Sequence, residues 1–112
     1  PSTGAPDTVP VLRGHALEIV DQHGKVRASI RVLPADPRVK MPDGTKGVPE
    51  TVLLRLIDPH GRPNVKIGAS EDGSGLGLGG KDEPTYVQVL AQRGSTSLKL
   101  TNQDGREQVI KP

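Results

Sequence analysis

The chain has 112 residues, with 15 Lys and Arg against 13 Asp and Glu, and 32% of its residues are hydrophobic. It has no cysteine, Phe or Trp and one tyrosine, which excludes disulfides, thiolate metal sites and an aromatic platform for stacking bases. The basic and acidic residues are interspersed, so we expect no nucleic acid partner. The length suits one domain, and no run approaches the roughly 18 apolar residues of a membrane span.

The N-terminal residues 1–12 are predicted to be a linker, because PSTGAPDTVP is made largely of small residues and proline. The remaining residues 13–112 are predicted to form a single domain. An anchor or targeting segment upstream of the linker would place the domain outside the cytoplasm or at a membrane. A linker inside a cytoplasmic protein explains the same composition, so the compartment stays open.

Four segments of 14 residues align without gaps, starting at Leu17, Leu54, Leu76 and Leu98. Apolar residues recur two positions apart on both sides of a central turn, which is the period of a strand with one apolar face. We therefore predict an all-β fold of about eight short antiparallel strands in four hairpin repeats, arranged as a meander, barrel, sandwich or short solenoid. The predicted core positions are Leu17, Ile19, Ala28, Ile30, Leu54, Leu56, Val65, Ile67, Leu76, Leu78, Val87, Val89, Leu98, Leu100 and Val109.

Three of the four central turns carry Asp or Asn at the first position and Gly at the fourth. The first side chain can accept a hydrogen bond from a backbone N–H two residues on, and glycine tolerates the positive φ that ends such a turn. The predicted turns are Asp21–Gly24, Asp58–Gly61 and Asn102–Gly105. The third repeat has a different turn sequence, so its turn or its register is expected to differ.

An insertion at residues 33–50 separates the first repeat from the second and contains four prolines. Its Pro42-Asp43-Gly44 turn, between Val39 and Val48, predicts a small extra hairpin. Long loops often carry function, and the charges here could face a ligand. The predicted binding residues are Arg38, Lys40, Asp43 and Lys46.

Other patterns in the chain indicate neither a cofactor nor a metal. Gly75–Gly80 matches G-x-G-x-x-G, but no helix follows it, so these glycines are expected to relieve crowding where backbones approach closely. His23 and His60 occupy the same turn position in two repeats and have no third ligand at a suitable spacing. No pair of carboxylates has the context of a general acid and base, and no catalytic residue is predicted.

A second set of apolar residues has the opposite strand parity to the predicted core. If these side chains share one surface, that surface needs a cover, and we predict a homo-oligomer formed through it. The set is Leu33, Leu53, Ile57, Leu90 and Ile110.

The L-x-L-x-D-x-x-G-[KR] hairpins at Leu17–Lys25 and Leu54–Arg62 resemble those of uncharacterised bacterial D-x-x-G hairpin repeat proteins. They are also distantly similar to the hairpins of Rhs-type shells, with Val20 and Ile57 in place of tyrosine. The resemblance implies no activity. The sequence therefore favours a non-catalytic binding or structural β-module, with an enzyme site around the Leu33–Glu50 loop as the alternative, and it does not identify a ligand.

Overall fold

The computed structural model describes residues 10–41 and 44–112, and within them the chain forms ten strands and no helix. The prediction of an all-β fold is confirmed. Most of the predicted linker, residues 1–9, lies outside the described residues, as does the predicted binding residue Asp43. The strands are β1 Ala16–Val20, β2 Val26–Leu33, β3 Asp36–Lys40, β4 Lys46–Val48, β5 Thr51–Leu56, β6 Val65–Ser70, β7 Gly73–Gly79, β8 Tyr86–Gln92, β9 Ser95–Thr101 and β10 Glu107–Ile110.

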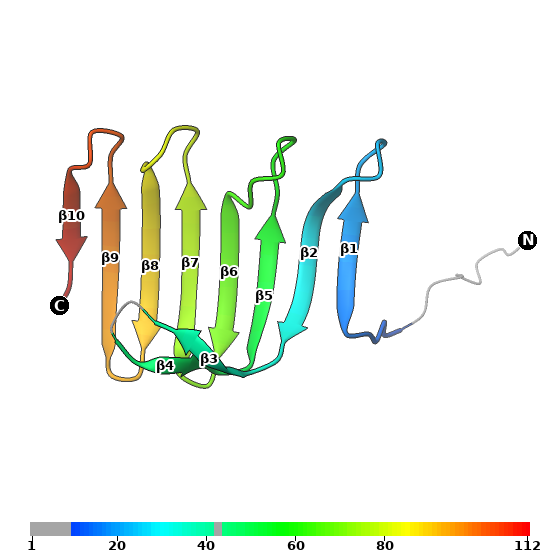
Figure 1. Ribbon diagram of the computed structural model, residues 1–112, viewed down its shortest axis with the longest axis horizontal. Helices are drawn as coiled ribbons and strands as arrows, with labels where there is room; N and C mark the ends of the chain where they lie inside the picture. Colours follow the sequence, from blue (N-terminus) through cyan, green and yellow to red (C-terminus); the bar gives the residue numbers. More distant parts are fainter. Residues whose placement is uncertain (1–9, 42–43) are drawn as a thin grey trace, which may run out of the picture.

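Eight of these strands form one antiparallel sheet in the order β1-β2-β5-β6-β7-β8-β9-β10. Figure 1 shows them side by side in a single layer, each joined to its neighbour, with β1 and β10 at opposite edges. The sheet is therefore the open meander, one of the predicted arrangements, and the prediction of a closed barrel is wrong. Closure requires a stagger between strands. Directly paired residues instead make a straight row from Leu17 in β1 to Ile110 in β10.

The insertion forms the predicted extra hairpin from β3 and β4. The Met41 N–H donates to the Thr45 carbonyl at 2.8 Å, next to the turn. Because β2 pairs directly with β5, the insertion leaves the main sheet uninterrupted. In Figure 1 the hairpin lies at the end of the sheet where the β6–β7 and β8–β9 turns are.

The three predicted turns are all at the opposite end of the sheet. In each, the glycine N–H donates to the carbonyl of the first turn residue at 2.9–3.0 Å, and the glycine has a φ of 80–86°. The Asp21 and Asp58 carboxylates also accept hydrogen bonds from N–H groups two and four residues on. The third repeat differs in its turn, which is closed by a hydrogen bond from the Gly80 N–H to the Thr85 carbonyl, while its strands pair in the same register as those of the second repeat.

The fourth repeat differs from the predicted register by one residue. Leu98 pairs with Ile110, and Val109 pairs with Lys99 on the opposite face. In the first repeat an irregularity between Ile19 and Val20 shifts the pairing by one residue, and the β9–β10 pairing has no such shift. Since one residue reverses the side-chain direction, Ile110 replaces Val109 on the face that was predicted to be the core.

No apolar side chain is buried among the residues that the structure describes. Leu17 and Ile19 keep 52% and 55% of their surface exposed, and Leu56 keeps 46%. The prediction that this face is the most buried part of the molecule is therefore wrong. The apolar pattern was interpreted correctly as one sheet face, but no second layer of the described chain covers that face.

Candidate binding surfaces

One side of the sheet, hereafter the apolar face, carries three rows of side chains that run across the strands. The middle row passes through all eight strands, and the other two rows flank it on the same side of the sheet. None of the three rows contains a charged residue. The middle row is Leu17, Ile30, Leu54, Ile67, Leu76, Val89, Leu98 and Ile110; the row nearer the predicted turns is Ile19, Ala28, Leu56, Val65, Leu78, Val87, Leu100 and Gln108; the third is Val32, Val52, Ala69, Ser74, Ala91 and Thr96.

The apolar face is hollowed in its C-terminal half. A groove of about 730 Å³ follows the middle row from Ile67 to Ile110, and its third-row lining consists of the small residues Ser74, Ala91 and Thr96. The corresponding places in β2 and β5 carry Val32 and Val52, both 46% exposed. The two halves of the face therefore differ in relief, with the larger third-row side chains on the N-terminal half.

The other side of the sheet, hereafter the polar face, carries charged and hydroxyl side chains. At its edges Glu18 pairs with Arg31, and Lys99 pairs with Glu107 at 3.3 Å. Near the middle, Arg55 stands directly opposite Lys66 across β5 and β6, and the buried Arg55 Nε has no hydrogen-bond partner among the described residues. These two adjacent cations make the centre of the polar face electropositive, and they repel each other.

Glycines in β7 give the polar face a low strip on which side chains of β8 lie. The Tyr86 hydroxyl lies over Gly77, and the Leu90 Cδ2 atom lies 2.8 Å from where a Cβ on Gly75 would stand. The expectation that these glycines relieve crowding is confirmed at Gly75 and Gly77, although the close neighbours are side chains rather than backbone. The strand β7 leads into a loop and β8 rather than a nucleotide-binding helix. A groove of about 260 Å³ remains beside Lys66, Tyr86 and Gln88.

The second apolar set is divided between the two faces rather than forming one surface, and Leu33 lies beside Leu53 on the polar face. Leu53 and Leu90 lie half-buried on the polar face, over Gly68 and Gly75 respectively, and Ile110 belongs to the apolar face. Of the two faces, the apolar face therefore carries the larger exposed apolar surface.

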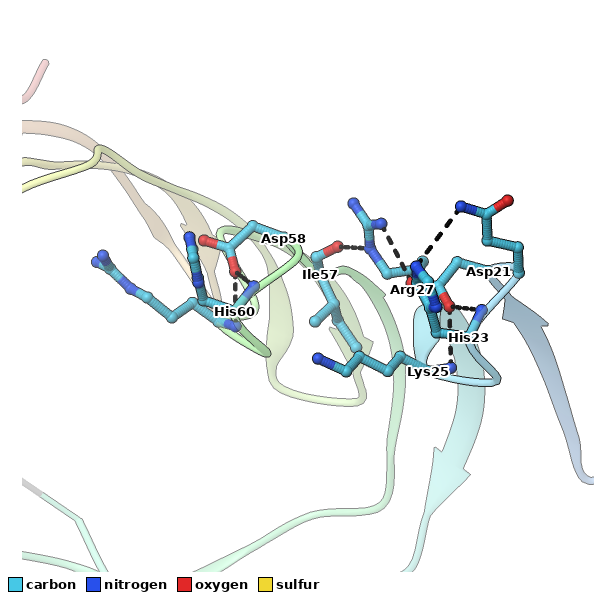
Figure 2. A network of polar contacts seen from close by, with 9 residues as sticks. Asp21, His23, Lys25, Arg27, Ile57, Asp58 and His60 are labelled. Carbon is cyan, nitrogen blue, oxygen red and sulfur yellow. Dashed lines mark hydrogen bonds and ion pairs between the residues drawn. The ribbon is translucent and has the colours of Figure 1, made fainter.

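The turns at the upper end of the sheet are tied together by two arginines that the sequence reasoning missed. Figure 2 shows Arg27 between the first two turns, where its Nε donates to the Ile57 carbonyl at 2.8 Å and its guanidinium pairs with Asp21 at 3.5 Å. Arg62 extends from the second turn to the third loop, donating to the Lys81 carbonyl at 2.7 Å and pairing with Glu83 at 3.2 Å. The sequence does place one arginine within six residues after each turn aspartate, but it does not indicate toward which neighbouring turn the side chain extends.

Hydrogen bonds within the first two turns lower the pKa of the turn carboxylates. The backbone N–H of Lys25 lowers the pKa of Asp21 below its ordinary value of 3.8, and the His23 N–H and Arg27 act in the same direction. The backbone N–H of Arg62 does the same to the pKa of Asp58, helped by the His60 N–H and the Asn64 amide. These carboxylates are thus structural acceptors, poorly suited to carrying a proton at neutral pH.

Of the predicted binding residues, Arg38 and Lys40 lie on β3 and Lys46 lies on β4, whereas Asp43 is outside the described residues. Arg38 pairs with Asp36 of its own strand at 3.2 Å, which also lowers the Asp36 pKa. Lys40 and Lys46 are directly paired across the hairpin, and both are exposed. The binding role of these residues stays a prediction.

A cavity of about 580 Å³ lies between this hairpin and the lower turns. Met41 and Lys46 line it on one side and Asp72 and Arg93 on the other, and the last two form an ion pair at 2.9 Å.

His23 and His60 lie in the first two turns (Figure 2), and the described part of the chain holds no group of three potential metal ligands. Within residues 10–41 and 44–112 there is also no helix of the length and apolarity needed to cross a bilayer.

Comparison of the whole chain with known proteins gives no relative from which a function could be inferred. No family model, curated protein or solved structure matches the chain. The resemblance to D-x-x-G hairpin repeat proteins therefore stays a prediction.

Proposed function

We propose that this chain is a non-catalytic β-module that acts by docking its apolar face onto a second apolar layer. The observation that carries the proposal is the middle row, which crosses eight strands on one side of a single-layer sheet. Apolar faces of sheets are stable when packed against another layer, and an exposed apolar patch of this extent is typical of an interaction site.

The polar groups support the same proposal. The Asp21 and Asp58 carboxylates accept backbone hydrogen bonds within their turns, and Asp72 pairs with Arg93 beside the insertion. An enzyme at the Leu33–Glu50 loop, the alternative, would need a nucleophile or base aligned with a partner group in a cleft. The paired Asp72 and Arg93 offer no such alignment.

Two variants of adjacent residues in β6 test the proposal. Ile67 points to the apolar face and Lys66 to the polar face, so Ile67→Asp and Lys66→Asp place the same carboxylate on opposite sides of the sheet. If the wild type associates in solution, we expect Ile67→Asp to lose that association and Lys66→Asp to keep it. If the wild type is a monomer, we expect Ile67→Asp to lose the binding of an apolar fluorescent dye and Lys66→Asp to keep it. An Ile67→Asp protein with the mass and the dye binding of the wild type would contradict the proposal.

A further inference from the structure

We infer that the layer covering the apolar face is a second copy of this chain, packed face to face about a two-fold axis parallel to the strands. This inference rests on the function proposed above and names the partner. In this arrangement β1 of one copy lies over β10 of the other, and the two sheets form a sandwich that neither chain makes alone.

The size of the face suits a dimer. Eight strands at a spacing of about 4.8 Å make it about 38 Å wide, and three rows cover about 20 Å along the strands. Each copy would thus cover about 750 Å², or about 1,500 Å² for the pair, which is the size of a standard stable protein interface.

The charge and twist of the face also favour a second copy. Its three rows contain no charged residue, so no charge within them repels an identical face or selects a partner of opposite charge. Sheets that pack in aligned sandwiches have matching twist. A second copy has the same twist and dimensions by construction, whereas any other partner would have to match both independently.

The relief of the face indicates the direction of the axis. The groove along the middle row lies over β6–β10, and the larger third-row side chains Val32 and Val52 lie in β2 and β5. A two-fold axis parallel to the strands places the N-terminal half of each copy over the groove of the other. The centre of the sheet falls between β6 and β7, so Ile67 would face Leu76 of the second copy.

Light scattering of the full chain at micromolar concentration tests the inference. We expect the wild type and Lys66→Asp to have twice the 11.8 kDa mass of one chain, and Ile67→Asp to fall to the mass of one chain. Mixing Ile67→Asp with Leu76→Lys should restore the double mass, because the two new charges meet across the axis. This mixture also decides the question if Ile67→Asp alone does not fold, since only a mixed dimer would then recover both mass and the circular dichroism of a sheet.

Two results would overturn the inference. The first is a folded wild type that keeps the mass of one chain at high concentration. If that monomer binds an apolar dye and Ile67→Asp does not, the proposed function stands with a different partner; if neither binds, both proposals fail. The second is a dimer that survives Ile67→Asp, because the copies would then meet through another surface. A mixture that shows no recovery would overturn the two-fold arrangement, because Ile67 of one copy would then not face Leu76 of the other.

Discussion

Truncation of Leu56 distinguishes a sheet that stands alone from one that is covered. Full burial of a leucine side chain contributes about 1.5–3 kcal/mol to stability. Leu56 keeps 46% of its surface exposed within one chain, so Leu56→Ala should cost only about 1 kcal/mol in an isolated sheet. Under a second layer the same change removes full burial and leaves a cavity, and the cost rises to about 2–5 kcal/mol.

Urea unfolding of wild type and Leu56→Ala, at low and high micromolar concentration, measures this difference. We expect the larger cost at high concentration, together with a wild-type unfolding midpoint that rises with concentration because association stabilises the folded chain. A cost near 1 kcal/mol at both concentrations, with a constant midpoint, would show that no second layer covers Leu56.

Three further changes test other parts of the structure. Gly73→Ala should cost about 2–4 kcal/mol, because Gly73 has a φ of 147° and an added Cβ would overlap the Ala91 carbonyl; Gly94→Ala, with open space around it, is the control in the same urea assay. Arg27→Gln should cost about 1 kcal/mol by removing the bond to the Ile57 carbonyl, whereas Arg106→Gln, whose guanidinium pairs with Asp104 of its own turn, should cost less in thermal unfolding. Because the pKa of Asp21 and of Asp58 is lowered on folding, their ionised forms stabilise the protein above pH 3.8 and this contribution is lost as the pH falls below that value. Asp21→Asn/Asp58→Asn should therefore lose less stability than the wild type between pH 5 and pH 2, roughly the range over which such carboxylates titrate, and an equal loss would contradict the assignment.

The strands and turns were predictable because their signals are local. The spacing of two at Leu54 and Leu56 gives a strand face, and Asp58 with Gly61 gives the turn, whatever surrounds them. The Val39–Val48 hairpin followed from the same kind of signal. The side of the sheet on which Ile110 lies was not predictable, because it depends on whether one residue is accommodated as a register shift after the turn.

Burial was predicted wrongly because it is a property of layers. An apolar row such as Leu17, Ile30 and Leu54 has the same pattern whether its cover comes from its own chain or from another molecule. The arginine contacts were missed for a related reason. Arg27 and Arg62 bond to carbonyls of neighbouring turns, and those neighbours are fixed by the strand order rather than by nearby sequence.

Thiol reactivity tests most directly whether the apolar face is covered in the folded protein. The chain has no cysteine, so Ile67→Cys and Lys66→Cys each report on one face of β6 through their rate of reaction with a maleimide. We expect Ile67→Cys to react more slowly than Lys66→Cys at high protein concentration, and the two rates to become similar on dilution. Equal rates at every concentration, in a protein that remains folded, would show that the apolar face stays open and that no second layer docks on it.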